Sequence, residues 1–152
     1  MRSTVRLAND AWEALLSAHA VLLKEFLAED LWGEISMREY DVLYTLAKAG
    51  MPVRIGDLQD HVLLSQPALS RMVDRLVARD LIQRGPDPSD ARGVLISLTD
   101  AGREIQRNVG RRHARHVAAS MTRRLDTEAL GQLEELCGRL ANHLPDPEDG
   151  RS

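Results

Sequence analysis

Residues 65–100 read SQPALSRMVDRLVARDLIQRGPDPSDARGVLISLTD, and this stretch decides the fold. It opens on Ser65, a residue type that caps helices, and Pro67 falls in the first helical turn, where its missing N–H costs nothing. The apolar residues then recur at i, i+3, i+4 and i+7, at Leu69, Met72, Val73 and Leu76. This spacing predicts an amphipathic helix with one buried stripe and one polar face.

The second half of the stretch predicts a β-hairpin. Two short runs rich in β-prone residues, Leu81–Arg84 and Val94–Leu98, flank a segment of glycine, proline and aspartate. We expect these runs to be the two strands and the segment between them to be a long tip.

The preceding residues predict two further helices. Residues 36–39 have the Ser-x-x-Glu pattern of a capping box, which starts a helix from about Met37 to Ala49, and Gly50 supplies its stop. A short helix follows over about residues 55–62. A helix-turn-helix followed by a hairpin is the layout of a winged helix, so we expect a mainly α protein with a small β-hairpin.

A winged helix of this kind is suited to DNA. The N-terminal residues of the second helix can reach base edges in the major groove, where glutamine pairs with adenine and arginine with guanine. An arginine on the wing can enter the narrow minor groove, and an aspartate two residues earlier can pair with an arginine and hold the loop in shape. The predicted DNA-binding residues are Ser65, Gln66, Pro67, Ser70, Arg71, Arg75, Asp90 and Arg92.

The ordered set of motifs resembles the MarR (multiple antibiotic resistance regulator) family of winged helix-turn-helix transcriptional regulators. The carrying segments are residues 65–76, Leu81–Arg84, Asp90–Gly93 and Leu98–Gly102. The resemblance implies a recognition helix, an Asp-x-Arg wing and a Leu-Thr-x-x-Gly start to the next helix. The middle wing position, often arginine in that family, is Ala91 here, which puts one basic contact in doubt.

Long helices are expected on both sides of this middle region. One covers about Leu7–Leu31, and an arginine-rich helix and a last helix follow Thr99, which can cap the first of these two. The last helix has an apolar seam in steps of three and four, at Leu130, Leu133, Cys137, Leu140 and Leu144. Residues 1–35 and 100–145 are therefore predicted to form or link to a homodimer interface, 36–99 to bind double-stranded operator DNA, and 146–152 to be a polar tail.

The composition narrows the class of protein. The net charge is −3, but residues 102–124 contain seven arginines against one glutamate, so the charge is unevenly distributed. No signal peptide or membrane-length apolar run is present, which favours a cytoplasmic protein without membrane contact. There is no nucleophile motif, phosphate loop or paired acid constellation, so we expect no enzyme and no cofactor.

Three alternatives stay open. The resemblance implies a small-molecule effector, often phenolic or anionic, and conceivable lining residues are Trp12, His19, Trp32, Tyr40 and Arg112. His113 and His116 share a helix face and could make the regulator metal-responsive, although two imidazoles do not form a site and we expect no metal. The winged helix could also serve protein–protein contact alone. Cys137, the single cysteine, lies on the apolar seam, where redox sensing is not expected.

Overall fold

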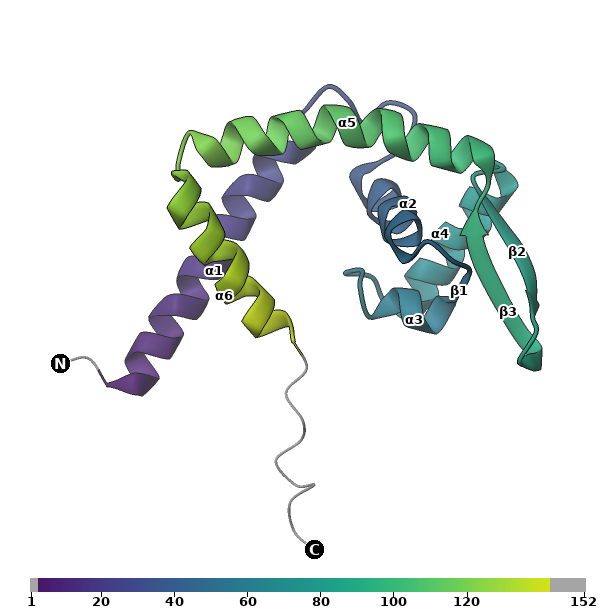
Figure 1. Cartoon of the computed structure of the whole chain (residues 1–152), viewed down its shortest axis with the longest axis horizontal. Helices are drawn as coiled ribbons and strands as arrows, with labels where there is room; N and C mark the ends of the chain where they lie inside the picture. The colour runs from purple at the N-terminus through teal and green to yellow at the C-terminus, as the bar shows by residue number, and fades with distance from the viewer. Residues whose placement is uncertain (1–2, 143–152) are drawn as a thin grey trace, which may run out of the picture. The chain divides into compact units, whose positions relative to one another are not determined.

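The computed structural model describes residues 3–142 (Figure 1). In chain order its elements are α1 (Thr4–Leu27), α2 (Met37–Ala49), β1 (Val53–Arg54), α3 (Ile55–Gln59), α4 (Gln66–Ala78), β2 (Ile82–Asp87), β3 (Asp90–Leu98), α5 (Asp100–Thr122) and α6 (Thr127–Ala141). The chain forms two compact units, the first ending at Ala114 and the second beginning at Arg115. The boundary between them therefore falls inside α5.

The hydrophobic core of the first unit lies among α2, α3, α4 and the hairpin. The predicted apolar stripe of α4 is buried, and Leu69, Val73 and Leu76 have no exposed surface. These side chains pack with Val42 and Leu43 of α2 and with other buried residues of the sheet and of α5. Burying the apolar face leaves the polar face of α4 directed to solvent.

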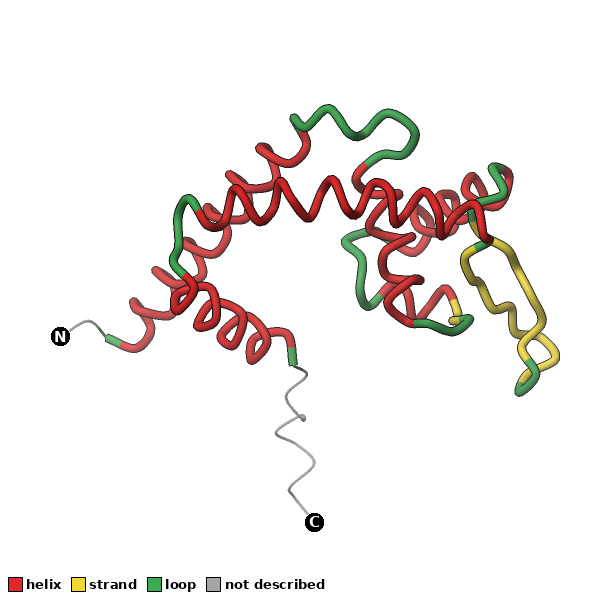
Figure 2. The backbone as a smooth tube through the Cα atoms, turned by 45° about the horizontal axis from the view of Figure 1, so that its top comes forward, coloured by secondary structure: helices red, strands yellow, loops and turns green. Residues whose placement is uncertain are grey.

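The sheet has three antiparallel strands in the order β1-β3-β2. Only the hairpin was expected, because Val53–Arg54 is too short to be recognised as a strand from its own sequence. β1 pairs through Val53 with Ile96 and through Arg54 with Leu95, so it lies on the opposite side of β3 from β2. Figure 2 shows the hairpin extending away from the other elements of the first unit.

The prediction of a long hairpin tip is wrong. The strands extend to Asp87 and from Asp90, which leaves Pro88 and Ser89 as the turn. Glycine and proline in this segment suggested a loop, but Gly85 and Pro86 lie within β2, with an irregularity in register between Pro86 and Asp87. β2 is an edge strand of the sheet. Such a strand tolerates proline, which lacks a backbone N–H, at a position where that N–H would point away from the neighbouring strand.

The predicted helix caps are confirmed. Ser36 Oγ accepts a hydrogen bond from the Glu39 amide at 3.2 Å, and the Glu39 carboxylate accepts from the Ser36 amide at 2.8 Å. Gly50 ends α2 in the left-handed conformation, at φ 67°. Ser65 caps α4, and Thr99 Oγ1 accepts from the Gly102 amide at 3.0 Å in the first turn of α5.

The first helix ends earlier than expected. Its last residue is Leu27 rather than a residue near Leu31, and Gly33 lies in the connection to α2. The Trp32 indole N–H donates to the carbonyl of Phe26 at 2.7 Å, which satisfies one of the carbonyl groups at the end of α1. Leu31 is buried in the core of the first unit. This apolar residue therefore serves core packing and does not extend the helix.

In the second unit, the Asp126 carboxylate caps α6 by accepting from the Ala129 amide at 2.9 Å. None of the residues of α6 is buried, and Leu133, Leu136 and Leu140 are 36 %, 54 % and 74 % exposed. Leu144 of the predicted seam and the predicted tail at 146–152 lie outside the described residues. Within residues 3–142 no helix has the length and apolar character needed to cross a membrane.

Candidate nucleic-acid interface

The first turns of α4 present polar side chains to solvent. Gln66, Pro67 and Arg71 are exposed, and Ser70 is half-buried. Ser65 is exposed too, but its hydroxyl accepts from the Ala68 amide at 3.4 Å, so this oxygen already serves as the helix cap. The N-terminal turns of a helix offer backbone N–H groups and a positive dipole end, both suited to phosphate oxygens.

The wing carries the second group of predicted residues. Arg92 lies on β3 and is exposed, rather than in a loop as expected. Asp90 Oδ1 accepts from the Arg92 amide at 3.0 Å, which shapes the start of the strand. The arginine that approaches the Asp90 carboxylate is Arg54, with Nη2 at 3.5 Å from Oδ2.

The arginines of the first unit divide into paired and unpaired groups. Arg79 donates to Glu39 at 3.2 Å, and Arg84 pairs with Asp74. Within residues 3–142 no hydrogen-bond or ion-pair partner is found for the side chains of Arg71, Arg75 or Arg92. The guanidinium groups of Arg71, Arg75 and Arg92, which the sequence assigned to DNA, therefore remain available to a ligand.

The sequence did not single out a contact between β1 and the wing. Asp87 is 8 % exposed, and its carboxylate accepts from Arg54 Nε at 2.8 Å and also from Arg54 Nη2. Its other oxygen accepts from the Ser89 hydroxyl at 2.7 Å and from the Ser89 amide at 2.9 Å. The Ser89 donors, followed by Arg54, hold the pKa of Asp87 down at about 2, so this carboxylate stays ionised at neutral pH.

Neither His113 nor His116 belongs to a group of three or more potential metal ligands among the described residues. His113 packs against the rings of Phe26, Trp32 and Tyr40 at centroid distances of 5.3, 5.3 and 5.6 Å, and its Nδ1 lies 3.5 Å from the Glu29 carboxylate. In the part of the chain that the structure describes, no group of three or more His, Cys, Asp or Glu side chains could hold a metal ion. The aromatic surroundings account for His113 as a packing residue.

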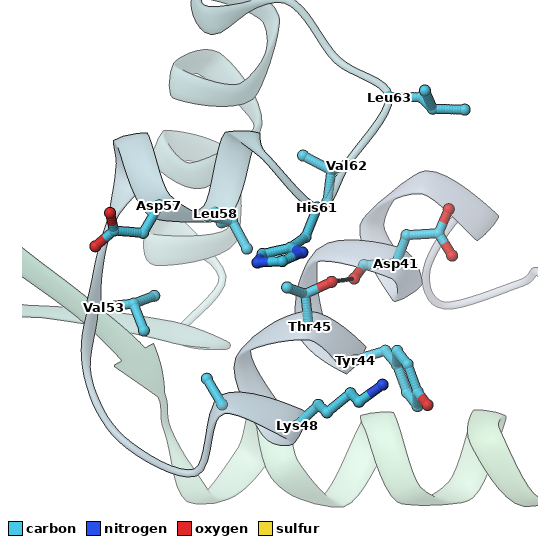
Figure 3. Close-up of a pocket in the computed structure, with 11 residues that line it drawn as sticks. Asp41, Tyr44, Thr45, Lys48, Val53, Asp57, Leu58, His61, Val62 and Leu63 are labelled. Atoms are coloured by element: carbon cyan, nitrogen blue, oxygen red, sulfur yellow. Dashed lines mark hydrogen bonds between the residues drawn. The ribbon is translucent and has the colours of Figure 1, made fainter. Parts of the chain in front are cut away.

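A pocket of about 610 Å³ lies in the first unit between α2 and α3 with the loop that follows it (Figure 3). Its walls are mainly apolar, and charged or polar groups come from Asp41, Lys48, Asp57 and His61. Burial raises the pKa of Asp41, and the nearby His113 opposes this shift. None of the five lining residues suggested by the sequence borders this pocket: Trp12, His19, Trp32, Tyr40 and Arg112.

Those five residues have other surroundings. Trp12 is 58 % exposed on α1, where His19 is also exposed. Trp32 and Tyr40 belong to the aromatic cluster around His113, and the Arg112 guanidinium donates to the carbonyl of Asp30 at 2.8 Å. Pocket residues of this chain could not be identified from sequence because α2 and α3 bring them together only after folding.

Comparisons with known proteins agree with this architecture. A sequence model of the MarR family matches residues 35–94. The multiple antibiotic resistance protein MarR of Salmonella typhimurium is 30 % identical over 107 residues, which cover 70 % of this chain and 74 % of that protein.

Two solved structures from Streptomyces coelicolor have the same fold. Sco3205, a MarR family transcriptional regulator in complex with DNA, is 27 % identical with a TM-score of 0.76, covering 98 % of this chain and 94 % of that one. The PcaV transcriptional regulator in complex with its natural ligand is 26 % identical with a TM-score of 0.65, covering 93 % and 96 %. With its DNA-binding winged helix, the chain belongs to the MarR family of transcriptional regulators.

Proposed function

We propose that this regulator is a homodimeric repressor that reads a near-palindromic operator. In each half-site α4 lies in the major groove, where Gln66, Pro67, Ser70 and Arg71 contact bases or phosphates. Arg92 of the wing enters the adjacent minor groove. Arg75, one turn further along α4, contacts phosphate.

One observation carries the proposal. In a chain with net charge −3, the exposed arginines on α4 and on β3 have no intramolecular partner among the described residues, whereas Arg54, Arg79 and Arg84 do. Unpaired guanidinium groups on a recognition helix and a wing suit a polyanion, because each contact with phosphate releases condensed counterions. The complex of Sco3205 with DNA supports the same choice of ligand.

The experiment uses fragments of the host genome selected by their binding to the protein. Arg71→Ala and Arg92→Ala should each weaken duplex binding roughly 5- to 150-fold, as expected for loss of an arginine that reads a base or a groove. Arg103→Ala, an exposed arginine on α5, is the matched control and should bind like the parent. Fluorescence anisotropy over a range of salt concentrations measures both the affinity and its salt dependence.

Two results would contradict the assignment. Parental affinity in Arg71→Ala and Arg92→Ala would remove these residues from the interface. Absence of duplex binding by the parent even at low salt would favour a winged helix that contacts only proteins. A reporter gene placed behind the selected operator tests repression, since expression should rise when the regulator is deleted.

Exposed apolar side chains on the outer helices support the dimer. α1 has no buried residue, and its Val5, Trp12 and Val21 are each more than half exposed. α6 exposes Leu133 and Leu140 of the predicted seam. Apolar surface of this extent on a helix usually marks a protein interface. Two-fold pairing would place two recognition helices about one DNA turn apart.

Release by a small effector is also part of the proposal. The pocket between α2 and α3 supports it, because an aromatic ring fits its apolar walls, and Lys48 and His61 offer hydrogen bonds to an acidic group. The complex of PcaV with its natural ligand shows that one relative of this fold binds a ligand. A regulator of operator DNA would act in the cytoplasm.

A further inference from the structure

The tip of the wing contains two carboxylates that face each other across the hairpin. Asp87 on β2 and Asp90 on β3 are partners in the strand register. Like charges directly opposite in an antiparallel pair repel one another. Two residues beyond Asp90 stands Arg92, the side chain assigned to the minor groove, so these acids lie where phosphates would approach.

Arg54 of β1 joins these two carboxylates. Its Nε donates to Asp87 Oδ2 at 2.8 Å, and its Nη2 contacts Asp87 and lies 3.5 Å from Asp90 Oδ2. Arg54 is 33 residues from Asp87 in sequence, so the contact ties the wing to the helix-turn-helix part of the chain. A guanidinium suits this task because its planar fork presents several donors in fixed directions.

Gly93 on β3, the strand that pairs with β2, leaves room for the contact between Arg54 and Asp87. A Cβ added at Gly93 would lie 2.9 Å from Asp87 Cβ and 3.0 Å from Asp87 Oδ2, the oxygen that Arg54 binds. Glycine at this position therefore leaves the space through which the Asp87 side chain reaches Arg54. Ser89 holds the other Asp87 oxygen, which orients the carboxylate from the turn side.

We propose that Arg54 is a positioning residue for DNA binding, which braces the wing by joining Asp87 and Asp90 and so presents Arg92 to the minor groove. The inference rests on the proposed role of Arg92. By joining the two acids, Arg54 limits the directions that the wing can adopt. Preorganisation of this kind increases affinity without adding a contact to the ligand.

A double-mutant cycle between Arg54 and Arg92 tests the proposal on operator DNA. Arg54→Ala should weaken binding about ten-fold in the parent, as expected for lost preorganisation of a binding element. In the Arg92→Ala background the same change should have little further effect, because Arg54 acts through Arg92. Arg54→Lys should restore part of the affinity, and Arg84→Ala, which breaks another pair of the wing with Asp74, is the matched control.

The slope of affinity against salt separates a brace from a direct phosphate contact. Loss of a phosphate contact reduces the slope by about 1. Arg54→Ala should leave the slope unchanged in the Arg92→Ala background. A reduced slope there, or independent effects of the two substitutions, would overturn the proposal in favour of direct contact.

Amide hydrogen exchange tests the brace without DNA. The Ser89 and Arg92 amides donate to the Asp87 and Asp90 carboxylates. Both should exchange faster in Arg54→Ala and in Gly93→Ala, while the amides of α2 keep parental rates. Unchanged exchange at Ser89 and Arg92 would show that Arg54 is no brace. Parental DNA binding by Arg92→Ala would instead refute the proposed function, so the two failures are distinguishable.

Discussion

Gly102 shows how one residue joins the wing region to α5. A Cβ added at this position would lie 1.9 Å from the carbonyl oxygen of Leu81. That backbone cannot easily move, because the Leu81 amide donates to Leu76 at 2.9 Å and its carbonyl accepts from Thr99 at 3.2 Å. The close approach of the Leu81 carbonyl therefore explains why the last position of the Leu-Thr-x-x-Gly motif is glycine.

We predict that Gly102→Ala lowers the free energy of unfolding by at least about 2 kcal/mol, because overpacking against fixed backbone forces the helix away. Gly131→Ala in α6 is the control, since a Cβ there meets no atom within 4 Å. It should raise the stability by about 0.5–1 kcal/mol through helix propensity. Urea unfolding followed by circular dichroism measures both. Equal stability of Gly102→Ala and the parent would contradict the close approach.

At the scale of elements, α2 starts and ends and α4 starts where local signals place them, whereas α3 ends at Gln59 rather than near residue 62 as expected. The capping box at Ser36, the left-handed Gly50 and the cap at Ser65 each act within one turn of chain. α3 and the connection after it depend instead on their neighbours. They form one wall of the pocket, and α2 forms the other (Figure 3).

The pocket gives an element-scale prediction about the effector. A panel of small benzoates and phenols should contain at least one compound that releases the parent from operator DNA. Thr45→Trp, which fills the pocket from α2, should keep operator affinity and lose this response. Fluorescence anisotropy of labelled operator measures release.

Thr122→Trp is the matched control for the filled pocket. Thr45 and Thr122 each donate a hydroxyl hydrogen bond to the carbonyl four residues earlier at 2.8 Å, but only Thr45 lines the pocket. If the compound releases Thr45→Trp from operator DNA as well as it releases Thr122→Trp, the effector binds outside this pocket. Lack of response by the parent to every compound would exclude this class of effector.

At the scale of the whole molecule, we predict that the parent sediments as a dimer and that a chain truncated before Leu130 sediments as a monomer. The physical reason is that α6 exposes leucines that would be covered in a dimer. The full-length double variant Leu133→Glu/Leu140→Glu is a second test that does not depend on folding of the truncated chain. It should also sediment as a monomer. Gln132→Glu, an exposed change on the same helix, should remain dimeric. A dimeric truncated chain would show that the seam is not the interface.

Sequence alone determined the features that depend on short-range contacts. Helix caps and the buried stripe of α4 follow from residues three or four positions apart, and the hairpin follows from β-prone runs on either side of turn residues. A single sequence displays both patterns directly. The motif set also predicted the family, and the comparisons confirm it. The choice of Arg71 and Arg92 for DNA stays a prediction.

Tertiary structure decided the features that join distant segments. β1 is too short to be a strand without β3 beside it, and the wing strands continue through Gly85 and Pro86 because pairing with β3 outweighs their local preference for a turn. The pair of Arg54 with Asp87, and the pocket between α2 and α3, arise from residues that meet only in the folded chain. No local sequence pattern predicts these contacts, because packing of the shared core, and not the neighbouring residues in sequence, determines which residues come together.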